Sequence, residues 1–260
     1  MAIAFLARSA DCIAFAGQAL GDQDMQKRGK TLAAMARAAF VRNWMSGNTI
    51  NCSTQTSHVL ALDFDLVPEE HRSAVADRLE NLIAARNDHL NTGFLGTPSF
   101  LPALAKTGRL KTLAKVLLQR SFPSWLAPIV HGKATTIWER WDSWTPERGF
   151  QSTHMNSFNH PVFGCAADWL MTGLVGIASD PQRPGWRHIR LAPCFIPGID
   201  WVRGSVETPL GKVESSWRRQ EGKILWTIHL PSGTRATVCL PNQEEELSSG
   251  VYSLEVALSE

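Results

Sequence analysis

The sequence lacks an excess of charge of either sign. Its 26 Lys and Arg residues against 24 Asp and Glu residues leave a formal net charge of +2 over 260 residues, without a run of basic residues. Proteins that bind nucleic acid or anionic membranes usually gather basic residues on one segment or surface. The charge pattern therefore predicts neither nucleic acid nor a membrane as a partner.

Cysteine pairs are also missing. The five cysteines are odd in number and widely spaced, and none forms a C-x-x-C pair: Cys12, Cys52, Cys165, Cys194 and Cys239. Such spacing favours free or buried thiols in a reducing compartment over a disulfide framework or a zinc site. We therefore expect a cytoplasmic protein with no metal and no other cofactor.

Several common catalytic motifs are absent as well. The sequence has neither a GxGxxG nor a GxxxxGK[ST] phosphate loop, no serine in a nucleophile elbow and no H-x-x-x-H pair. The pair Asp63 and Asp65 lacks the further oxygen ligands and the glycine of a calcium loop, which favours two exposed acids at a helix end. Phosphate-loop chemistry, serine hydrolysis and metal hydrolysis are therefore unsupported.

The apolar start of the chain does not resemble a targeting segment. Residues 1–7 are apolar, but Arg8 and Asp11 interrupt the run and no basic segment leads it. We expect a buried helix here, and neither a signal peptide nor a membrane span.

Hydrophobic periodicity divides the chain into two parts. Up to about residue 178 the apolar residues recur at helical spacing, which predicts helices near 2–20, 25–44, 53–65, 69–86, 98–106, 109–120 and 156–178. After Asp180 the pattern alternates with a period of two, and Gly-containing turns separate the runs. The acidic stretch 243–249 is expected to be a solvated loop before a last strand over 251–256. These patterns predict a mainly α domain over 1–182 and a small antiparallel β-sandwich over 183–260.

The most informative segment places a carboxylate between two indoles. Glu139 lies between Trp138 and Trp141, and a second run ends on Asn159 and His160. Aromatic faces stack on the apolar face of a sugar ring, polar side chains take its hydroxyls, and a carboxylate can activate water beside the anomeric carbon. The alternative is that these indoles belong to the core and that Glu139 is a surface residue.

Short motifs along the whole chain resemble those of bacterial α-L-rhamnosidases and occur in the same order. They are Gln55-Thr56-Ser57, Val67-Pro68-Glu69-Glu70, Thr92-Gly93-Phe94-Leu95-Gly96-Thr97-Pro98, Pro123-Ser124-Trp125, Thr135-Thr136-Ile137-Trp138-Glu139-Arg140-Trp141-Asp142, Met155-Asn156-Ser157-Phe158-Asn159-His160 and Trp217-Arg218-Arg219.

This resemblance implies a fold and roles for particular residues. The fold is the C-terminal half of a six-hairpin (α/α) barrel followed by the family's C-terminal β-sandwich. By resemblance, Glu139 is the general base that activates water and His160 helps to hold rhamnose. Trp138, Trp141 and Asn159 are the further candidates for contact with the sugar. The reaction implied is inverting hydrolysis of terminal α-L-rhamnose from a glycoside or polysaccharide.

One part of the family's machinery has no counterpart in the sequence. The general acid, a glutamate in the first half of the barrel, is missing, and Asp142 and Asp168 are poor substitutes. We therefore expect a truncated enzyme, partnered by the missing N-terminal half or by a second copy of the chain. Two alternatives stay open: a carbohydrate-binding remnant without catalysis, and a six-hairpin glycosidase acting on another sugar.

Overall fold

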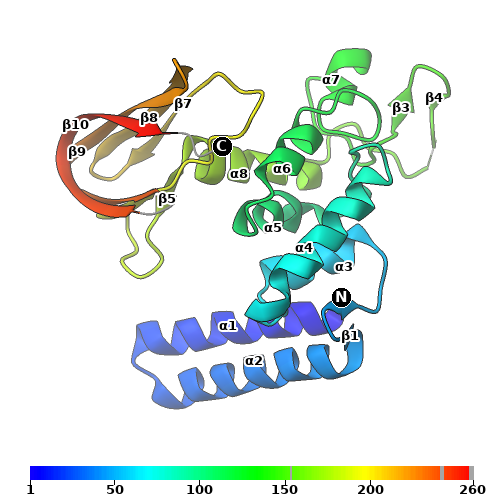
Figure 1. The fold of residues 1–260 in the computed structure, drawn as a ribbon, viewed down its shortest axis with the longest axis horizontal. Helices are drawn as coiled ribbons and strands as arrows, with labels where there is room; N and C mark the ends of the chain where they lie inside the picture. The colour runs from blue at the N-terminus through cyan, green and yellow to red at the C-terminus, as the bar shows by residue number, and fades with distance from the viewer. Residues whose placement is uncertain (153, 241–242, 258–260) are drawn as a thin grey trace. The chain divides into compact units, whose positions relative to one another are not determined.

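The computed structural model describes residues 1–152, 154–240 and 243–257. By its internal contacts the chain divides into two compact units, Met1–Phe163 and Gly164–Glu260. The first unit is mainly helical and the second is built around a β-sheet (Figure 1).

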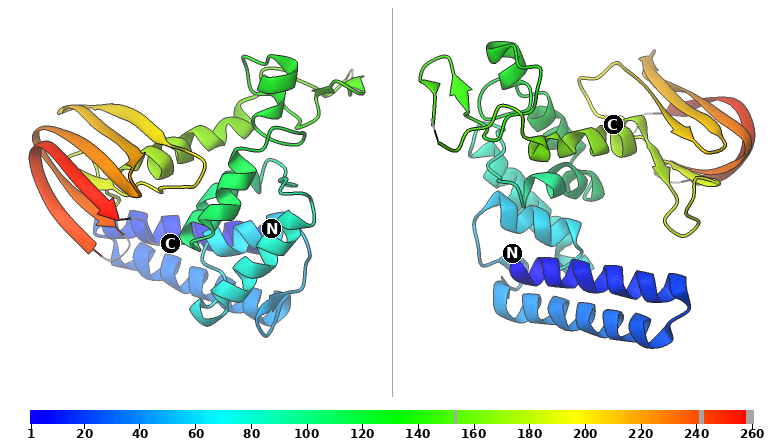
Figure 2. Two further views of the ribbon diagram at one scale, coloured as in Figure 1. Left: turned by 45° about the horizontal axis from the view of Figure 1, so that its top comes forward. Right: turned by 180° about the vertical axis from the view of Figure 1, so that it is seen from behind.

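Unit 1 begins with a long antiparallel helical hairpin, α1 (Ala2–Leu20) and α2 (Gln23–Trp44), whose helices lie side by side in every view (Figures 1 and 2). The two helices meet through small residues. A Cβ atom added at Gly29 would lie only 2.4 Å from the Ala14 backbone nitrogen, so this contact admits no side chain at Gly29. On α1 the buried positions are Ala4, Ala7, Ala10, Ala14 and Gly17.

The larger apolar side chains of α1 do not take part in this contact. Leu6, Ile13 and Phe15 are 44%, 44% and 45% exposed. The expected buried helix is therefore buried along its small-residue face alone. By length and composition α1 is also apolar enough to cross a membrane, a property shared by signal sequences and by core helices of soluble proteins.

Shorter helices complete unit 1. They are α3 (Gln55–Asp63), α4 (Glu69–Ala84), α5 (Phe100–Lys106), α6 (Leu110–Leu117) and α7 (Ala127–Gly132), and a short 3-10 helix, η1 (Thr97–Ser99), precedes α5. The helices predicted up to residue 120 are confirmed within a few residues at each end. Three elements were not predicted: α7 and two short hairpins, β1–β2 (Met45–Ser46, Thr49–Ile50) and β3–β4 (Trp144–Thr145, Gly149–Phe150).

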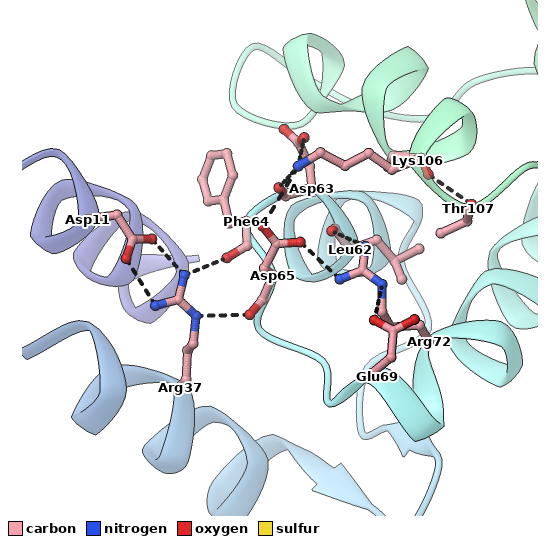
Figure 3. A network of polar contacts seen from close by, with 11 residues as sticks. Asp11, Arg37, Leu62, Asp63, Phe64, Asp65, Glu69, Arg72, Lys106 and Thr107 are labelled. Carbon is pink, nitrogen blue, oxygen red and sulfur yellow. Dashed lines mark hydrogen bonds and ion pairs between the residues drawn. The ribbon is translucent and has the colours of Figure 1, made fainter. Parts of the chain in front are cut away.

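An ionic network joins the elements of unit 1 around Asp65 (Figure 3). The Arg37 guanidinium donates to both carboxylate oxygens of Asp11 at 3.1 and 2.6 Å and to the Asp65 carbonyl at 2.9 Å. The hydrogen bond to Asp11 raises the pKa of Arg37. Arg72 pairs with the Asp65 carboxylate at 2.9 Å, and Lys106 pairs with Asp63 at 3.2 Å. Asp63 and Asp65 are thus bound by basic side chains.

The sequence predicted one helix over 156–178, and the structure has a shorter helical run over Pro161–Val175. Residues 156–160 are not helical, and they are followed by a 3-10 helix η2 (Pro161–Cys165), a short α8 (Ala166–Trp169) and a π-helix η3 (Leu170–Val175). Pro161 gives the physical reason, because a residue before proline is disfavoured in the α conformation. Gly176, with φ of 81°, then ends η3, and strand β5 (Ile177–Ser179) follows.

The β-strands of unit 2 form one mixed six-stranded sheet. Its order is β5, β6 (His188–Leu191), β9 (Lys223–Leu240), β8 (Gly211–Gln220), β7 (Trp201–Thr208), and β10 (Gln243–Ala257) pairs with β9. All pairs are antiparallel except β6 with β9, which is parallel. The expectation of a purely antiparallel arrangement is therefore wrong for this pair.

The longest strands, β9 and β10, form a curved hairpin that runs through the whole sheet (Figure 1). Their register shifts between Ser248 and Gly250. The acidic stretch that was expected to be a loop belongs to β10, since Gln243 to Ser248 pair with β9 from Leu240 back to Arg235. Glu246, for example, accepts a hydrogen bond from Thr237 across the ladder at 2.6 Å.

The change of hydrophobic period and the internal contacts place the boundary between the two parts of the chain at different residues. The change of period predicts a boundary at 182, whereas the contacts divide the chain after Phe163. The reason lies in η3, which packs on the sheet of unit 2. The Val175 carbonyl accepts a hydrogen bond from Ser215 at 2.8 Å, and the Leu174 carbonyl accepts one from Trp217 at 2.9 Å.

Candidate active site

The candidate residues of unit 1 lie on two irregular segments, 135–143 and 154–160, that are joined by backbone hydrogen bonds. The Glu139 N–H donates to the Ser157 carbonyl at 2.9 Å, and the His160 N–H donates to the Ile137 carbonyl at 2.8 Å. The structure therefore brings the two motifs together, although neither forms a helix or a long strand.

Glu139 is half-buried and its carboxylate is held at one oxygen. Oε2 accepts a hydrogen bond from the Ser157 N–H at 2.7 Å. Within the described residues no group hydrogen-bonds to Oε1. One oxygen is thus fixed and the other is available to accept a proton, which is the arrangement that a general base needs.

Trp138 is part of the packed interior of this region. It is 7% exposed and meets Phe158 edge to face, with ring centroids 5.1 Å apart. A Cβ atom added at Gly132, the last residue of α7, would lie 2.6 Å from Cη2 of the Trp138 indole. The Trp138 ring therefore packs the segment that carries Glu139 against the end of α7.

Trp141 is half-buried and belongs to a cluster of aromatic rings. It stacks on Phe163 with centroids 3.9 Å apart and meets Trp125 edge to face at 5.5 Å. Its Nε1–H donates to the Thr92 carbonyl at 2.9 Å. Phe94 extends the cluster by packing on Phe163 at 5.2 Å. These contacts tie the loop 91–97 to the segment of Glu139.

His160 lies at the end of the aromatic cluster. Its ring stacks on Phe94 with centroids 5.0 Å apart and an interplanar angle of 13°. Nδ1 is buried and has no hydrogen-bond partner among the described residues. Stacking on Phe94 is therefore the contact that orients the imidazole.

The two asparagines of the second motif differ in their surroundings. Asn156 donates from Nδ2 to the Ser143 carbonyl at 2.9 Å, so it connects the two segments. Asn159 is exposed, and its backbone N–H donates to Ser157 Oγ at 3.2 Å. Of the two, Asn159 has the side chain that is free to meet a ligand.

Sequence reasoning missed Ser143, which is fully buried and fixes the turn after Glu139. Its Oγ donates to the Arg140 carbonyl at 3.1 Å, and it accepts from the Arg140 N–H at 3.2 Å. Its carbonyl accepts from the Gln151 N–H at 3.1 Å as well as from Asn156. No period or motif distinguishes a serine of this kind, because its role depends on non-local backbone contacts.

Two cavities of unit 1 adjoin the aromatic cluster. The smaller, of about 200 Å³, is lined by Trp125, Trp138 and Trp141 among others, but not by Glu139. The larger, of about 630 Å³, is lined by Phe94, by other residues of the loop 91–97 and by Cys52, whose pKa is lowered by hydrogen bonds from Ser57 and Thr54. Trp138 and Trp141 therefore line a cavity that Glu139 does not line.

The two acids that the sequence marked as poor substitutes for the general acid have different surroundings. Asp142 pairs with Arg140 at 3.3 Å and lies in a turn. Asp168 lies in α8, which belongs to unit 2. Within the described residues no group of three or more His, Cys, Asp or Glu side chains is placed to hold a metal ion.

Comparison with family models identifies both parts of the chain. Residues 1–174 match the bacterial alpha-L-rhamnosidase 6 hairpin glycosidase domain, and residues 176–255 match the bacterial alpha-L-rhamnosidase C-terminal domain. The junction of the two matches falls at η3, between the boundary given by the contacts and the boundary predicted from the period.

Curated relatives and solved structures carry the same name. An alpha-L-rhamnosidase of Streptomyces avermitilis is 39% identical over 242 residues, which are 93% of this chain and 23% of the relative, and one of Formosa agariphila is 34% identical over 94% of this chain and 26% of the relative. The chain thus spans about a quarter of these relatives. The Streptomyces avermitilis enzyme complexed with L-rhamnose superposes with a TM-score of 0.91 at 34% identity, covering 98% of this chain and 26% of that one. The Aspergillus terreus enzyme gives 0.92 at 31%, covering 97% and 30%.

Proposed function

This chain belongs to the bacterial α-L-rhamnosidase family, and from that premise we propose that it supplies the water-activating part of an enzyme that hydrolyses terminal α-L-rhamnosides. The observation that carries the proposal is the state of Glu139, whose Oε2 is fixed by the Ser157 N–H at 2.7 Å while Oε1 has no partner among the described residues.

The proposed reaction proceeds with inversion at the anomeric carbon. Glu139 takes a proton from water, and the water oxygen attacks the anomeric carbon on the face opposite the glycosidic oxygen. A carboxylic acid protonates the departing oxygen. Because this chain spans only about a quarter of its relatives, we propose that this acid comes from a part of the enzyme outside these 260 residues.

The sugar is held by the second motif in this proposal. His160, stacked on Phe94, and the exposed Asn159 provide polar atoms for rhamnose hydroxyls. For Trp138 and Trp141, direct contact with sugar stays a prediction. Their packing on Phe158 and Phe163 supports a positioning role, in which the two indoles hold the segment that carries Glu139 in place.

The finer features of the fold are part of the same proposal. We propose that the helices of unit 1 form the C-terminal half of an (α/α) barrel, completed by the remainder of a longer protein. We also propose that the two ends of the curved sheet form the faces of a β-sandwich. The shared hairpin β9–β10, which pairs with β8 at one end and β6 at the other, supports this arrangement.

A chimera tests the catalytic role. The matched region of the Streptomyces avermitilis relative is replaced by this chain, and hydrolysis of an aryl α-L-rhamnoside is measured for the unchanged chimera, Glu139→Gln and Glu147→Gln. Loss of a general base should lower kcat by about 10²–10⁴ in Glu139→Gln and leave L-rhamnose affinity within about tenfold. Glu147→Gln, at an exposed residue of the β3–β4 hairpin, should keep full activity. NMR of early product should show the β-anomer.

The outcomes separate the candidate functions. Near-normal turnover by Glu139→Gln would remove this residue from the mechanism. Rhamnose binding without turnover by the unchanged chimera would favour the carbohydrate-binding alternative, and turnover of another glycoside alone would favour a different sugar. The 260-residue chain by itself should not hydrolyse an unactivated rhamnoside at about 1 s⁻¹ or faster, within the usual enzymatic range.

A further inference from the structure

The outward face of the sheet in unit 2 carries a groove of about 600 Å³. It crosses β7, β8, β9 and β10, and Trp217 and Trp226 are among the residues that line it. These two side chains are only 2% and 1% exposed, and successive side chains of a strand point to opposite faces. The side chains that a ligand can reach in the groove are therefore those of the neighbouring outward positions.

Strand register sets the residues of the groove in two rows. The first row runs from Trp201 through Arg218 and Leu225 to Glu255. The second row runs from Arg203 through Ser216 and Thr227 to Ser253. Four neighbouring strands span roughly 14 Å, since adjacent strands lie about 4.8 Å apart. The groove is therefore long enough for an extended ligand.

One end of the groove has an exposed aromatic platform. Trp201 is 70% exposed on the edge strand β7. An indole offers a flat apolar face to the C–H side of a sugar ring and an N–H for a hydroxyl. Beyond it, Ser216, Thr227 and Ser253 supply short hydroxyl side chains that leave the groove shallow.

The charges beside this platform are positive. Arg218 makes no ion pair or side-chain hydrogen bond within the described residues, and Arg203 is 75% exposed in its side chain with Glu214 only at 4.0 Å. Among the described residues that line the groove Glu255 is the one acid, and it is bound by Lys223 at 2.9 Å. Guanidinium groups pair with carboxylates through two parallel hydrogen bonds, so the charge of the groove is complementary to an acidic ligand.

We propose that this groove binds a polysaccharide that carries uronic acids, with Trp201 stacked on a sugar ring and Arg203 and Arg218 holding carboxylates. The site would keep the enzyme on an acidic polymer while the active site acts on it. The choice of a polysaccharide rests on the proposed function, whereas the binding itself can be measured without any turnover.

Binding of polygalacturonic acid by the whole chain tests the proposal. Affinity electrophoresis and calorimetry are run on the unchanged chain, on Trp201→Ala and Arg218→Gln, and on two controls. The controls are Val251→Ala, an equally exposed apolar residue of the same face, and Arg235→Gln, an exposed arginine of β9 outside the groove. All four sites are exposed, so melting temperatures should be unchanged and should confirm that each variant folds.

The expected result is a selective loss of affinity. Trp201→Ala and Arg218→Gln should each weaken binding at least about tenfold, which corresponds to about 1.4 kcal/mol, while the controls change it less than about twofold. Binding should also weaken in about 1 M NaCl, where the Debye length falls to about 3 Å. No binding by the unchanged chain, equal loss in the controls, or equal binding of neutral dextran would each overturn the proposal. None of these outcomes bears on rhamnoside hydrolysis by the chimera.

Discussion

The two units bury tryptophan by different means. In the sheet of unit 2, Trp217 and Trp226 are 2% and 1% exposed and stand at inward positions of regular strands. In unit 1, Trp138 and Trp141 belong to an irregular segment, and their places are set by ring contacts with Phe158 and Phe163. In the sheet, the alternation of side chains along each strand determines which tryptophans are buried. Around Glu139, burial depends on contacts between individual aromatic rings.

This difference predicts where a lost indole costs most. In the sheet, the surrounding hydrogen-bond ladder is fixed, so a cavity cannot collapse easily. Trp226 also donates from Nε1 to Ser215 Oγ at 3.0 Å, and Ser215 donates onward to the Val175 carbonyl. We expect Trp226→Ala to lower the free energy of unfolding by about 3–5 kcal/mol, measured by urea denaturation.

A control on the same sheet sharpens that expectation. Trp201→Ala removes an equal side chain from the outward face, where Trp201 is 70% exposed, and should change stability by no more than about 0.5 kcal/mol. Equal losses from Trp226→Ala and Trp201→Ala would contradict the assignment of inner and outer faces.

The corresponding test in unit 1 adds a methyl group instead of removing a ring. Gly132→Ala would place a Cβ atom 2.6 Å from Trp138 Cη2. The indole cannot swing away freely because Phe158 packs against it, so we expect a loss of about 1–3 kcal/mol. Gly93→Ala is the matched control, because no atom lies within 4 Å of its added Cβ. A Gly132→Ala protein as stable as the control would show that Trp138 is loosely packed.

The helical spacing of apolar residues predicted where the helices lie better than it predicted which side of each helix is buried. The helix α2 was predicted from its apolar stripe, yet Leu32 and Met35 of that stripe are 38% and 63% exposed. The contact with α1 selects small residues such as Gly29 and Ala33, because the two backbones come too close for larger side chains. Hydrophobicity alone could not reveal this, since the choice depends on how closely the partner approaches.

Non-local pairing explains the other errors. The acidic strand 243–249 has little apolar character, and only its ladder with β9 makes it a strand. Similarly, 156–160 pairs by its backbone with 137–139, and the helical run begins only at Pro161. For the candidate site, Glu139, His160 and the motif that contains Phe94 were named from the sequence by resemblance, whereas Ser143 belongs to none of these motifs and its role depends on contacts with Arg140, Gln151 and Asn156.

The smallest expected effects on stability concern the two asparagines of the site, Asn156 and Asn159. Asn156→Ala removes the Nδ2 hydrogen bond to the Ser143 carbonyl, but that carbonyl keeps the Gln151 N–H at 3.1 Å. The substitution also removes Asn156 Oδ1, which is buried without a partner among the described residues. Losing the hydrogen bond destabilises the fold, and removing the unpartnered Oδ1 stabilises it. Because the two effects partly offset each other, we expect the free energy of unfolding to fall by about 0.5–1.5 kcal/mol.

Asn159→Ala provides the opposite pattern. The side chain is exposed, so stability should stay within about 0.5 kcal/mol of the unchanged chain. In the chimera, however, Asn159→Ala should weaken L-rhamnose binding, because the proposed hydroxyl contact is lost, while Asn156→Ala should act mainly through the position of Glu139 and lower kcat. Calorimetry with L-rhamnose and denaturation of the same two variants measure both effects. If Asn159→Ala destabilises the chain and leaves rhamnose affinity unchanged, then Asn159 is a structural residue and the sugar contact must be sought elsewhere.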